Sequence, residues 1–132
     1  LEGWCCGSSE IPKKILHKNI NNLEKIKDPK YQWRNFYNNK LKMEYKKLFK
    51  LFDELIFLKT SSFDNVFKWR LKQEKTNQSK NKKSKRMTPN EIKYFVQHYE
   101  KITKWMMKDL NKKAQIVIKF EKNHKISSIN FN

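Results

Sequence analysis

Apolar and aromatic residues recur at every third or fourth position between Tyr31 and Asp53. This spacing returns to the same side of an α-helix with each turn, so it predicts a long helix with a wide apolar face over residues 31–53. The positions in this series are Trp33, Tyr37, Leu41, Tyr45, Leu48 and Phe52, with Phe36 and Phe49 beside them.

Two further helices are predicted from the same periodicity together with helix-start signals. Ser61 or Ser62 caps a helix that carries Phe63, Val66, Phe67 and Leu71. Thr88-Pro89-Asn90-Glu91 combines a capping threonine, a proline at the first helical position and a glutamate in the capping-box position. The apolar face of the helix that follows consists of Ile92, Phe95, Val96, Tyr99, Ile102, Trp105, Met106 and Leu110. Residues 13–27 have irregular helical character and end at Asp28-Pro29.

Short unbroken apolar runs predict the strands. Residues 55–58 and 116–118 fit strands buried on both faces of a parallel sheet, and residues 126–131 fit a weak edge strand. Residues 1–4 read as the end of another strand, followed by a loop that contains Gly7. The order of strand, helices, strand, helices and strand predicts an α/β fold that is rich in helix.

The composition fits one domain of 132 residues. Apolar residues make up only 37%, but an aromatic content of 14% supplies enough buried area for a core. No apolar run reaches the roughly 20 residues that a membrane span needs, and no secretory signal is recognisable at the start. Cys5 and Cys6 are adjacent and have no other cysteine to pair with, so we expect a reducing, cytoplasmic setting. The scattered histidines show no metal-ligand spacing with them.

The formal net charge of +18 raises the question of a nucleic-acid partner. Only Arg34, Arg70 and Arg86 are arginines, whereas base recognition and bidentate phosphate binding favour arginine over lysine. The basic residues also lie on nearly every segment, so we expect a solvated surface and no nucleic-acid footprint. They are densest between residues 75 and 87, where the apolar pattern is lost and we predict a mobile basic loop.

Two residues could carry chemistry. Glu2, at the expected carboxyl end of a strand, could hold Mg²⁺ directly or through water against nucleotide phosphates, or it could be an ordinary surface residue. Arg70 is expected to point toward the core side of its helix, where either Glu74 or a phosphate would neutralise it. We expect the tryptophans at 33, 69 and 105 to be core residues.

Asparagines cluster near the start of the chain. Asn19, Asn21 and Asn22 could contact a polar substrate, although asparagine clusters are also common in loops.

Three segments together resemble the D-glycerate 3-kinase-like family of P-loop kinases, relatives of uridine and pantothenate kinases and phosphoribulokinase. Leu1-Glu2-Gly3-Trp4-Cys5-Cys6-Gly7 is similar to the family's segment of hydrophobic residue, E-G-W-x-x-G. Residues 69–74, WRLKQE, resemble its W-R-x-x-Q/A-E lid helix, and residues 87–99 resemble its M-[ST]-x-x-E-x-x-x-F-V-x-x-Y helix. The resemblance spans residues 1 to about 120.

The resemblance implies a P-loop NTPase fold of three α/β/α layers around a mostly parallel sheet. It implies that Glu2 lies near Mg²⁺ and the transferred phosphoryl group, and that Arg70 is a lid arginine that approaches ATP phosphates. Lys72 is placed with Arg70 in nucleotide binding, and Trp4, Asn19 and Asn22 with the substrate. The reaction would transfer phosphate from ATP to a hydroxyl of glycerate or a similar small metabolite.

The family's phosphate-cradling Gly-x-x-x-x-Gly-Lys-Ser/Thr loop is not in this sequence, whose two glycines are Gly3 and Gly7. The family carries that loop upstream of Glu-Gly-Trp, so the resemblance implies a C-terminal half, residues 1–132, whose partner is an N-terminal P-loop half. We expect the chain alone to be inactive. A second departure is Arg86, where the family has glycine before the Met-Ser/Thr motif.

Two other functions fit the same sequence. One is a basic module that binds nucleic acid or acidic partners through the loop at 75–86. The other is a kinase relative that folds but has no catalytic role.

Overall fold

The computed structural model describes residues 1–80 and 86–132. Its elements in chain order are α1 (Lys13–Leu16), α2 (Asn22–Lys27), α3 (Gln32–Lys40), the π-helical segment η1 (Leu41–Tyr45), α4 (Lys46–Phe49), β1 (Ile56–Thr60), α5 (Asp64–Lys80), α6 (Pro89–Lys113), β2 (Ile116–Phe120) and β3 (Ile126–Phe131).

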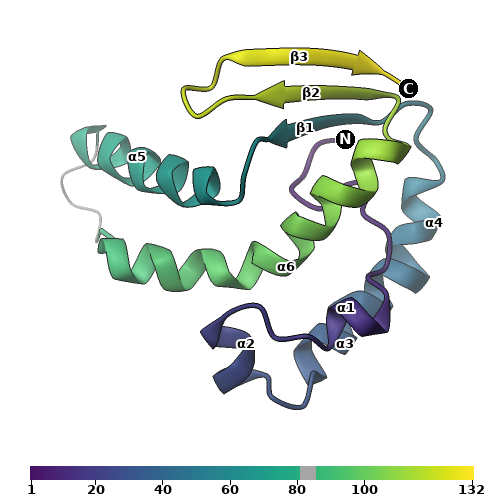
Figure 1. The fold of residues 1–132 in the computed structure, drawn as a ribbon, viewed down its shortest axis with the longest axis horizontal. Helices are drawn as coiled ribbons and strands as arrows, with labels where there is room; N and C mark the ends of the chain where they lie inside the picture. The colour runs from purple at the N-terminus through teal and green to yellow at the C-terminus, as the bar shows by residue number, and fades with distance from the viewer. Residues whose placement is uncertain (81–85) are drawn as a thin grey trace.

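The strands form one mixed sheet in the order β1-β2-β3. β1 and β2 are parallel, with Ile56 opposite Ile116, and the chain between them passes through α5 and α6. β3 lies at the edge of the sheet, as the sequence predicted for residues 126–131, and it runs antiparallel to β2. Figure 1 shows α6 running below the sheet and α5 extending from the end of β1. The fold is therefore of the α/β class, as predicted.

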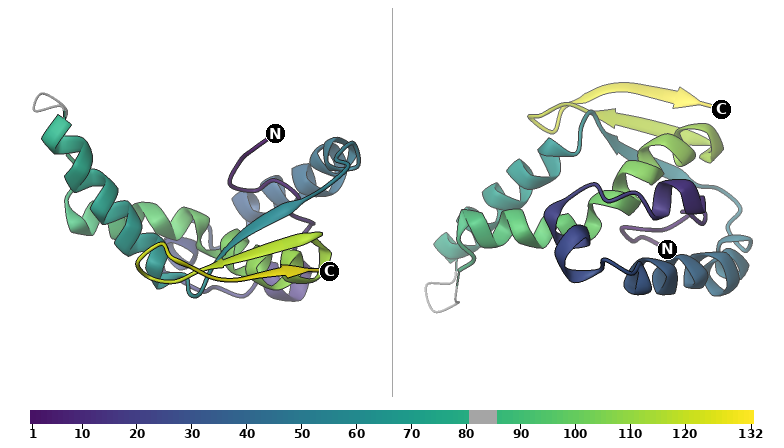
Figure 2. Two further views of the ribbon diagram at one scale, coloured as in Figure 1. Left: turned by 90° about the horizontal axis from the view of Figure 1, so that it is seen from above. Right: turned by 60° about the horizontal axis from the view of Figure 1, so that its bottom comes forward.

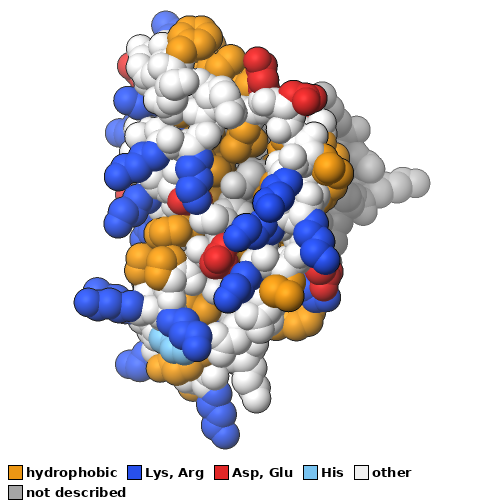
Figure 3. Space-filling view, turned by 90° about the vertical axis from the view of Figure 1, so that its right-hand side faces the viewer, with side chains coloured by type: hydrophobic (Ala, Val, Ile, Leu, Met, Phe, Trp, Pro, Cys, Tyr) orange, Lys and Arg blue, Asp and Glu red, His pale blue; other side chains and the backbone are white. Residues whose placement is uncertain are grey.

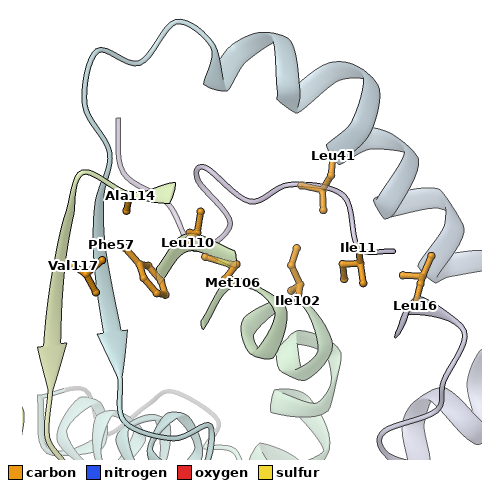
Figure 4. Packing of buried hydrophobic residues seen from close by; sticks show 9 residues of the cluster. All are labelled: Ile11, Leu16, Leu41, Phe57, Ile102, Met106, Leu110, Ala114 and Val117. Carbon is orange, nitrogen blue, oxygen red and sulfur yellow. The ribbon is translucent and has the colours of Figure 1, made fainter. Parts of the chain in front are cut away.

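The core lies between α6, the inner face of the sheet and the N-terminal segment. Ile102, Met106 and Leu110 form one stripe along α6, at the helical spacing that the sequence showed. Figure 4 shows this stripe facing Phe57 and Val117 of the sheet at one end and Ile11 and Leu16 at the other.

The prediction that residues 55–58 are buried on both faces of the sheet is wrong. Phe57 is buried against α6, but Ile56 is 52% exposed and Leu58 is 63% exposed. The reason is that α6 covers only the inner face, to which alternate side chains point. Ile129 and Phe131 of β3 add to the exposed outer face, so this face of a partly parallel sheet is apolar and open to solvent.

Residues 1–4 do not form a strand. The first residues are irregular and lead into a turn, in which the Cys6 N–H donates to Gly3 O and the Ser8 N–H donates to Cys5 O. A strand requires a neighbour for its backbone groups, and the three strands of the described sheet lie elsewhere. Gly7 closes the turn with a φ of +79°, and a Cβ there would lie 2.5 Å from Leu55 Cδ2.

The helix predicted over 31–53 is continuous from α3 through η1 to α4, but it ends at Phe49. Its buried side carries Arg34, Asn38 and Leu41, whereas Trp33 is 61% exposed, so the prediction of Trp33 as a core residue is wrong. The apolar pattern identified the helix correctly but not the side that the fold buries. That side is buried because its polar residues Arg34 and Asn38 bind polar groups of the neighbouring segments.

The helix α5 continues to Lys80, beyond Lys75, where the sequence lost its apolar pattern. Residues 81–85 of the predicted mobile loop lie outside the described residues. In the part of the chain that the structure describes, no helix combines the length and apolar character needed to cross a membrane.

Candidate functional site

The three segments that carry the family resemblance meet along one side of α6. Trp4 packs edge-on against Tyr99, with ring centroids 4.7 Å apart, and its indole N–H donates to Thr103 Oγ1. Tyr99 contacts Phe95 one turn earlier, at 5.0 Å, and the Arg70 guanidinium lies 5.7 Å from the centre of the Phe95 ring. We call Trp4, Tyr99, Phe95 and Arg70 the aromatic row.

The start of α6 is built to hold this row in place. The Thr88 hydroxyl accepts from the Glu91 N–H, and the Glu91 carboxylate accepts from the Thr88 N–H. Such a capping box satisfies two backbone donors that a helix start leaves free. Phe95 and Tyr99 follow one and two turns later, so the predicted capping signal also fixes the position of the aromatic row.

Arg70 forms an ion pair with Glu74, which was one of its two predicted partners. Its Nη1 lies 3.4 Å from Glu74 Oε2 and donates to Gln73 Oε1. Glu74 also accepts from the Met87 N–H, which links α5 to the chain leading into α6. The Arg70 side chain remains 27% exposed, so it is not closed off from solvent in the way a fully buried arginine is.

The remaining predicted site residues are on the surface. Glu2 is exposed in the irregular segment before Trp4, and Lys72 is exposed on α5. Asn19 and Asn22 are also exposed. Between them, Asn21 caps α2 by accepting from the Glu24 N–H, and its amide donates to Gln97 O and Glu100 Oε2. Trp4 and Arg70 are thus connected through the α6 residues Tyr99 and Phe95, whereas the asparagines lie at the start of α2 and are not part of the aromatic row.

Trp69 and Trp105 are half-buried and bonded to the backbone. Trp69 stacks on His124 and its indole N–H donates to Lys122 O, which ties α5 to the β2–β3 turn. The Trp105 indole N–H donates to Ser9 O. These contacts place α5 and the N-terminal segment against the rest of the fold.

Sequence reasoning missed a buried ionic network centred on Arg34. All five of its N–H donors are used: Nε donates to Asp28 Oδ2, Nη1 to Leu16 O and Glu24 Oε2, and Nη2 to Glu24 O and Asp28 O. Burial alone would raise the pKa of Asp28, but the bonds from Arg34 and from the Trp33 and Arg34 backbone N–H groups outweigh it and lower the pKa.

Lys101 of α6 joins this network from the other side. Its Nζ lies 3.2 Å from Glu24 Oε2 and donates to Ile15 O and Lys18 O. Burial lowers the pKa of Lys101, and the negative charge of Glu24 opposes that effect. In the sequence, Arg34 follows Trp33 and Lys101 precedes Ile102, but other polar residues are common in both helical stretches, so the pattern does not single out these two cations.

Cys5 and Cys6 are free thiols at the turn beside Trp4. Burial and the neighbouring Cys6 raise the pKa of Cys5, so this thiol is held in its unreactive, protonated form. Within residues 1–80 and 86–132, no three or more His, Cys, Asp or Glu side chains are grouped as metal ligands.

The basic side chains do not gather into one stripe on the face shown in Figure 3. Lysine and arginine are spread over this face, with acidic and hydrophobic side chains between them.

The fold is one that solved structures of longer proteins contain. Over 98% of its length the chain matches D-glycerate 3-kinase from Cryptococcus neoformans var. grubii serotype A, with a TM-score of 0.72 and 19% identity, covering 48% of that chain. It also matches the YGR205w protein, with a TM-score of 0.61 and 22% identity over 97% of this chain and 45% of that one. No family model and no curated protein matches the sequence.

The resemblance to D-glycerate 3-kinases is therefore confirmed at the level of the fold. The chain spans about half the length of the solved structures it matches. At these identities the similarity establishes the fold of this chain but not a reaction that the protein catalyses.

Proposed function

We propose that this chain is the lid-bearing portion of an ATP-dependent kinase that phosphorylates a hydroxyl of glycerate or a similar small metabolite. The observation that carries the proposal is the aromatic row, because it brings the three motifs of the family resemblance to one side of α6. The match of the chain to a D-glycerate 3-kinase supports it. We place the protein in the cytoplasm, where free cysteines are stable.

Each proposed site residue has a role that its surroundings allow. The exposed Glu2 carboxylate fits Mg²⁺, which protein sites commonly hold through one or two carboxylates together with water and substrate phosphates. The partly exposed Arg70 side chain fits the charge on a transferred phosphoryl group, and Lys72 adds positive charge on the same helix. Bound ATP and Mg²⁺ would supply the phosphoryl group and neutralise its charge.

The proposal requires a second segment that carries a phosphate-binding loop, since the two glycines of this chain cannot form one. The open outer face of the sheet fits such a segment. Ile56, Leu58, Ile129 and Phe131 form an apolar surface there, and parallel sheets are normally covered on both faces. We therefore expect the P-loop segment to cover this face and to pair with the free edge of β1.

The test is an ATP-consumption assay on the chain joined to its P-loop segment, with D-glycerate and Mg²⁺. Glu2→Gln should lower turnover by about 100-fold or more, because the transferred charge loses its metal ligand. Glu121→Gln, an exposed glutamate at the β2–β3 turn, is the matched control and should leave turnover unchanged. Equal turnover of the two variants would remove Glu2 from the mechanism, and no ATP consumption with any small hydroxy acid would refute the kinase.

A further inference from the structure

A pocket of about 440 Å³ lies between α6 and the helix formed by α3 and η1. The right-hand view of Figure 2 shows the N-terminal segment entering between these two helices. Most of the side chains that line the pocket are aromatic rings, contributed by Trp4, Trp33, Phe36, Tyr37, Tyr45, Phe95 and Tyr99. A concave site of this size, mostly apolar with a few polar groups, has the character of a small-molecule site.

The pocket adjoins the aromatic row. Trp4, Phe95 and Tyr99 belong to both, so a ligand in the pocket would contact the turn that follows Glu2. Arg70, one of the proposed phosphoryl-transfer residues, contacts Phe95, and Phe95 lines the pocket.

The charge of the lining favours an anionic group. Lys40 is the charged side chain that lines the pocket, together with the imidazole of His98, and its Nζ lies 5.7 Å from the centre of the Phe36 ring. Lys40 pairs with Glu44 on the same helix, but both side chains are largely exposed and such pairs contribute little. Lys40 can therefore turn toward a carboxylate in the pocket at small cost.

Two further polar side chains, His98 and Tyr37, complete the lining. His98 Nδ1 bonds to Phe95 O, which can only accept, so Nδ1 carries the proton and Nε2 can accept from a ligand hydroxyl. Burial, and then the negative charge of Glu24, raise the pKa of Tyr37, so its hydroxyl stays protonated. The polar lining thus suits a ligand with one carboxylate and one hydroxyl.

The size of the pocket excludes a good fit to the smallest hydroxy acids. A three-carbon hydroxy acid occupies on the order of 100 Å³, about the share of three or four water molecules. The pocket is several times larger. A ligand that filled only the space beside the polar side chains would leave most of the aromatic rings without contacts. A ligand that fills the remaining space needs an apolar part, and the faces of the aromatic rings favour a planar one.

We propose that this pocket binds a hydroxy carboxylate with a planar apolar body, larger than a three-carbon acid. The carboxylate lies near Lys40, a hydroxyl near His98, and the planar body between the rings of α3 and α6. This inference rests on the proposed function in taking the ligand to be the acceptor of the kinase. Within that function, it replaces glycerate by a larger hydroxy carboxylate as the acceptor.

The experiment measures binding to the 132-residue chain by calorimetry and NMR, without ATP or Mg²⁺. The probes are 3-phenyllactate, which has all three features, lactate, which has no ring, and 3-phenyl-1-propanol, which has no carboxylate. We expect 3-phenyllactate to bind about 10-fold or more tightly than lactate, since burying a phenyl ring contributes at least that factor. Its advantage over 3-phenyl-1-propanol should be about 3-fold, since a carboxylate paired with a partly exposed lysine contributes less.

Variants locate the binding to the pocket. Phe36→Ala should weaken 3-phenyllactate about 10-fold by removing one wall, and Lys40→Gln should abolish its advantage over 3-phenyl-1-propanol. Both side chains are substantially exposed, so the fold should tolerate these changes. Leu51→Ala, an exposed apolar residue away from the pocket, is the control and should change nothing.

Equal affinity for lactate and 3-phenyllactate, or no binding of either at millimolar concentration, would overturn the inference. A chain that self-associates through these rings, and becomes monomeric on Phe36→Asp, would overturn it in favour of a protein interface. Binding of 3-phenyllactate without phosphate transfer in the protein joined to its P-loop segment would reject only the proposed function. Phosphate transfer to a three-carbon acid without binding of 3-phenyllactate would reject only this inference.

Discussion

Arg34 on α3 and Arg70 on α5 both pair with acidic side chains, yet they differ in what remains available to a ligand. Arg34 is 2% exposed, and each of its five donors has an acceptor within the fold. Arg70 has one ion pair and one amide partner, and its side chain is partly exposed to solvent. A saturated buried arginine holds the fold together, whereas an arginine with donors left over can bind an anion.

The largest effect is expected from Arg34→Met. This change leaves Asp28 without its buried cation and Glu24 with Lys101 alone, and breaking a buried pair typically costs about 3–5 kcal/mol of unfolding free energy. Urea denaturation followed by circular dichroism measures it, with the exposed Arg86→Met as the matched control. A loss below about 1 kcal/mol would mean that the network does not hold α1 and α2 in place.

Lys101→Met should have the next largest effect. It removes the donor to two backbone carbonyls, Ile15 O and Lys18 O, and one of the two cations beside Glu24. The expected loss is about 2–3 kcal/mol, because buried acceptors are left unpaired. Lys108→Met, an exposed lysine two turns further along α6, is the control. If the two variants unfold at the same urea concentration, Lys101 contributes nothing to the network.

The pH dependence of stability tests Asp28. Its pKa is lower in the folded protein than the ordinary value of 3.8, so its contribution is fully present above 3.8 and is lost as the pH falls through the folded value. Asp28→Asn should cost about 1–2 kcal/mol at neutral pH, and the gap to the unmodified protein should narrow below about pH 4. Melting temperatures between pH 3 and pH 7 measure this gap, and one that widens toward acid would contradict the assignment.

The smallest effect on stability is expected from Arg70→Gln. An i,i+4 pair with a partly exposed arginine contributes about 0.5 kcal/mol or less, so the melting temperature should hardly change. In the protein joined to its P-loop segment, the same variant should lower kcat by about 100-fold if the arginine stabilises the transferred charge. A variant that unfolds easily would show Arg70 to be a structural residue like Arg34.

The features that the sequence predicted well are those set by local spacing. The start of α6 at Thr88, its apolar stripe through Leu110 and the pairing of Arg70 with Glu74 all depend on residues three or four positions apart. The parallel strands followed from short apolar runs separated by helices. Such patterns can be predicted because the spacing that defines each lies within one element, even where the packing partners come from other elements.

The features that were missed depend on which surfaces meet in space. Trp33 and Leu41 belong to the same wide apolar face predicted from the sequence, yet Trp33 is exposed. The reason is that the chain packs Arg34 and Asn38 inward against polar groups up to 27 residues away. Likewise, nothing in the apolar run of β1 reveals which of its faces a helix covers. A hydrophobicity pattern records that a residue can be buried, and the location of its partners decides whether it is.

The π-helical segment between Leu41 and Tyr45 has a consequence for how this gene can change. A π turn holds one residue more than an α turn of similar length, so the segment amounts to a single inserted codon within a helix. Because the π turn takes up its extra residue locally, loss of one codon there would restore regular α-helix and leave the helix on either side in nearly the same orientation. Leu41 and Tyr45 both line the aromatic pocket. An in-frame deletion of one codon would therefore reshape that pocket while leaving α1, α2 and the sheet as they are.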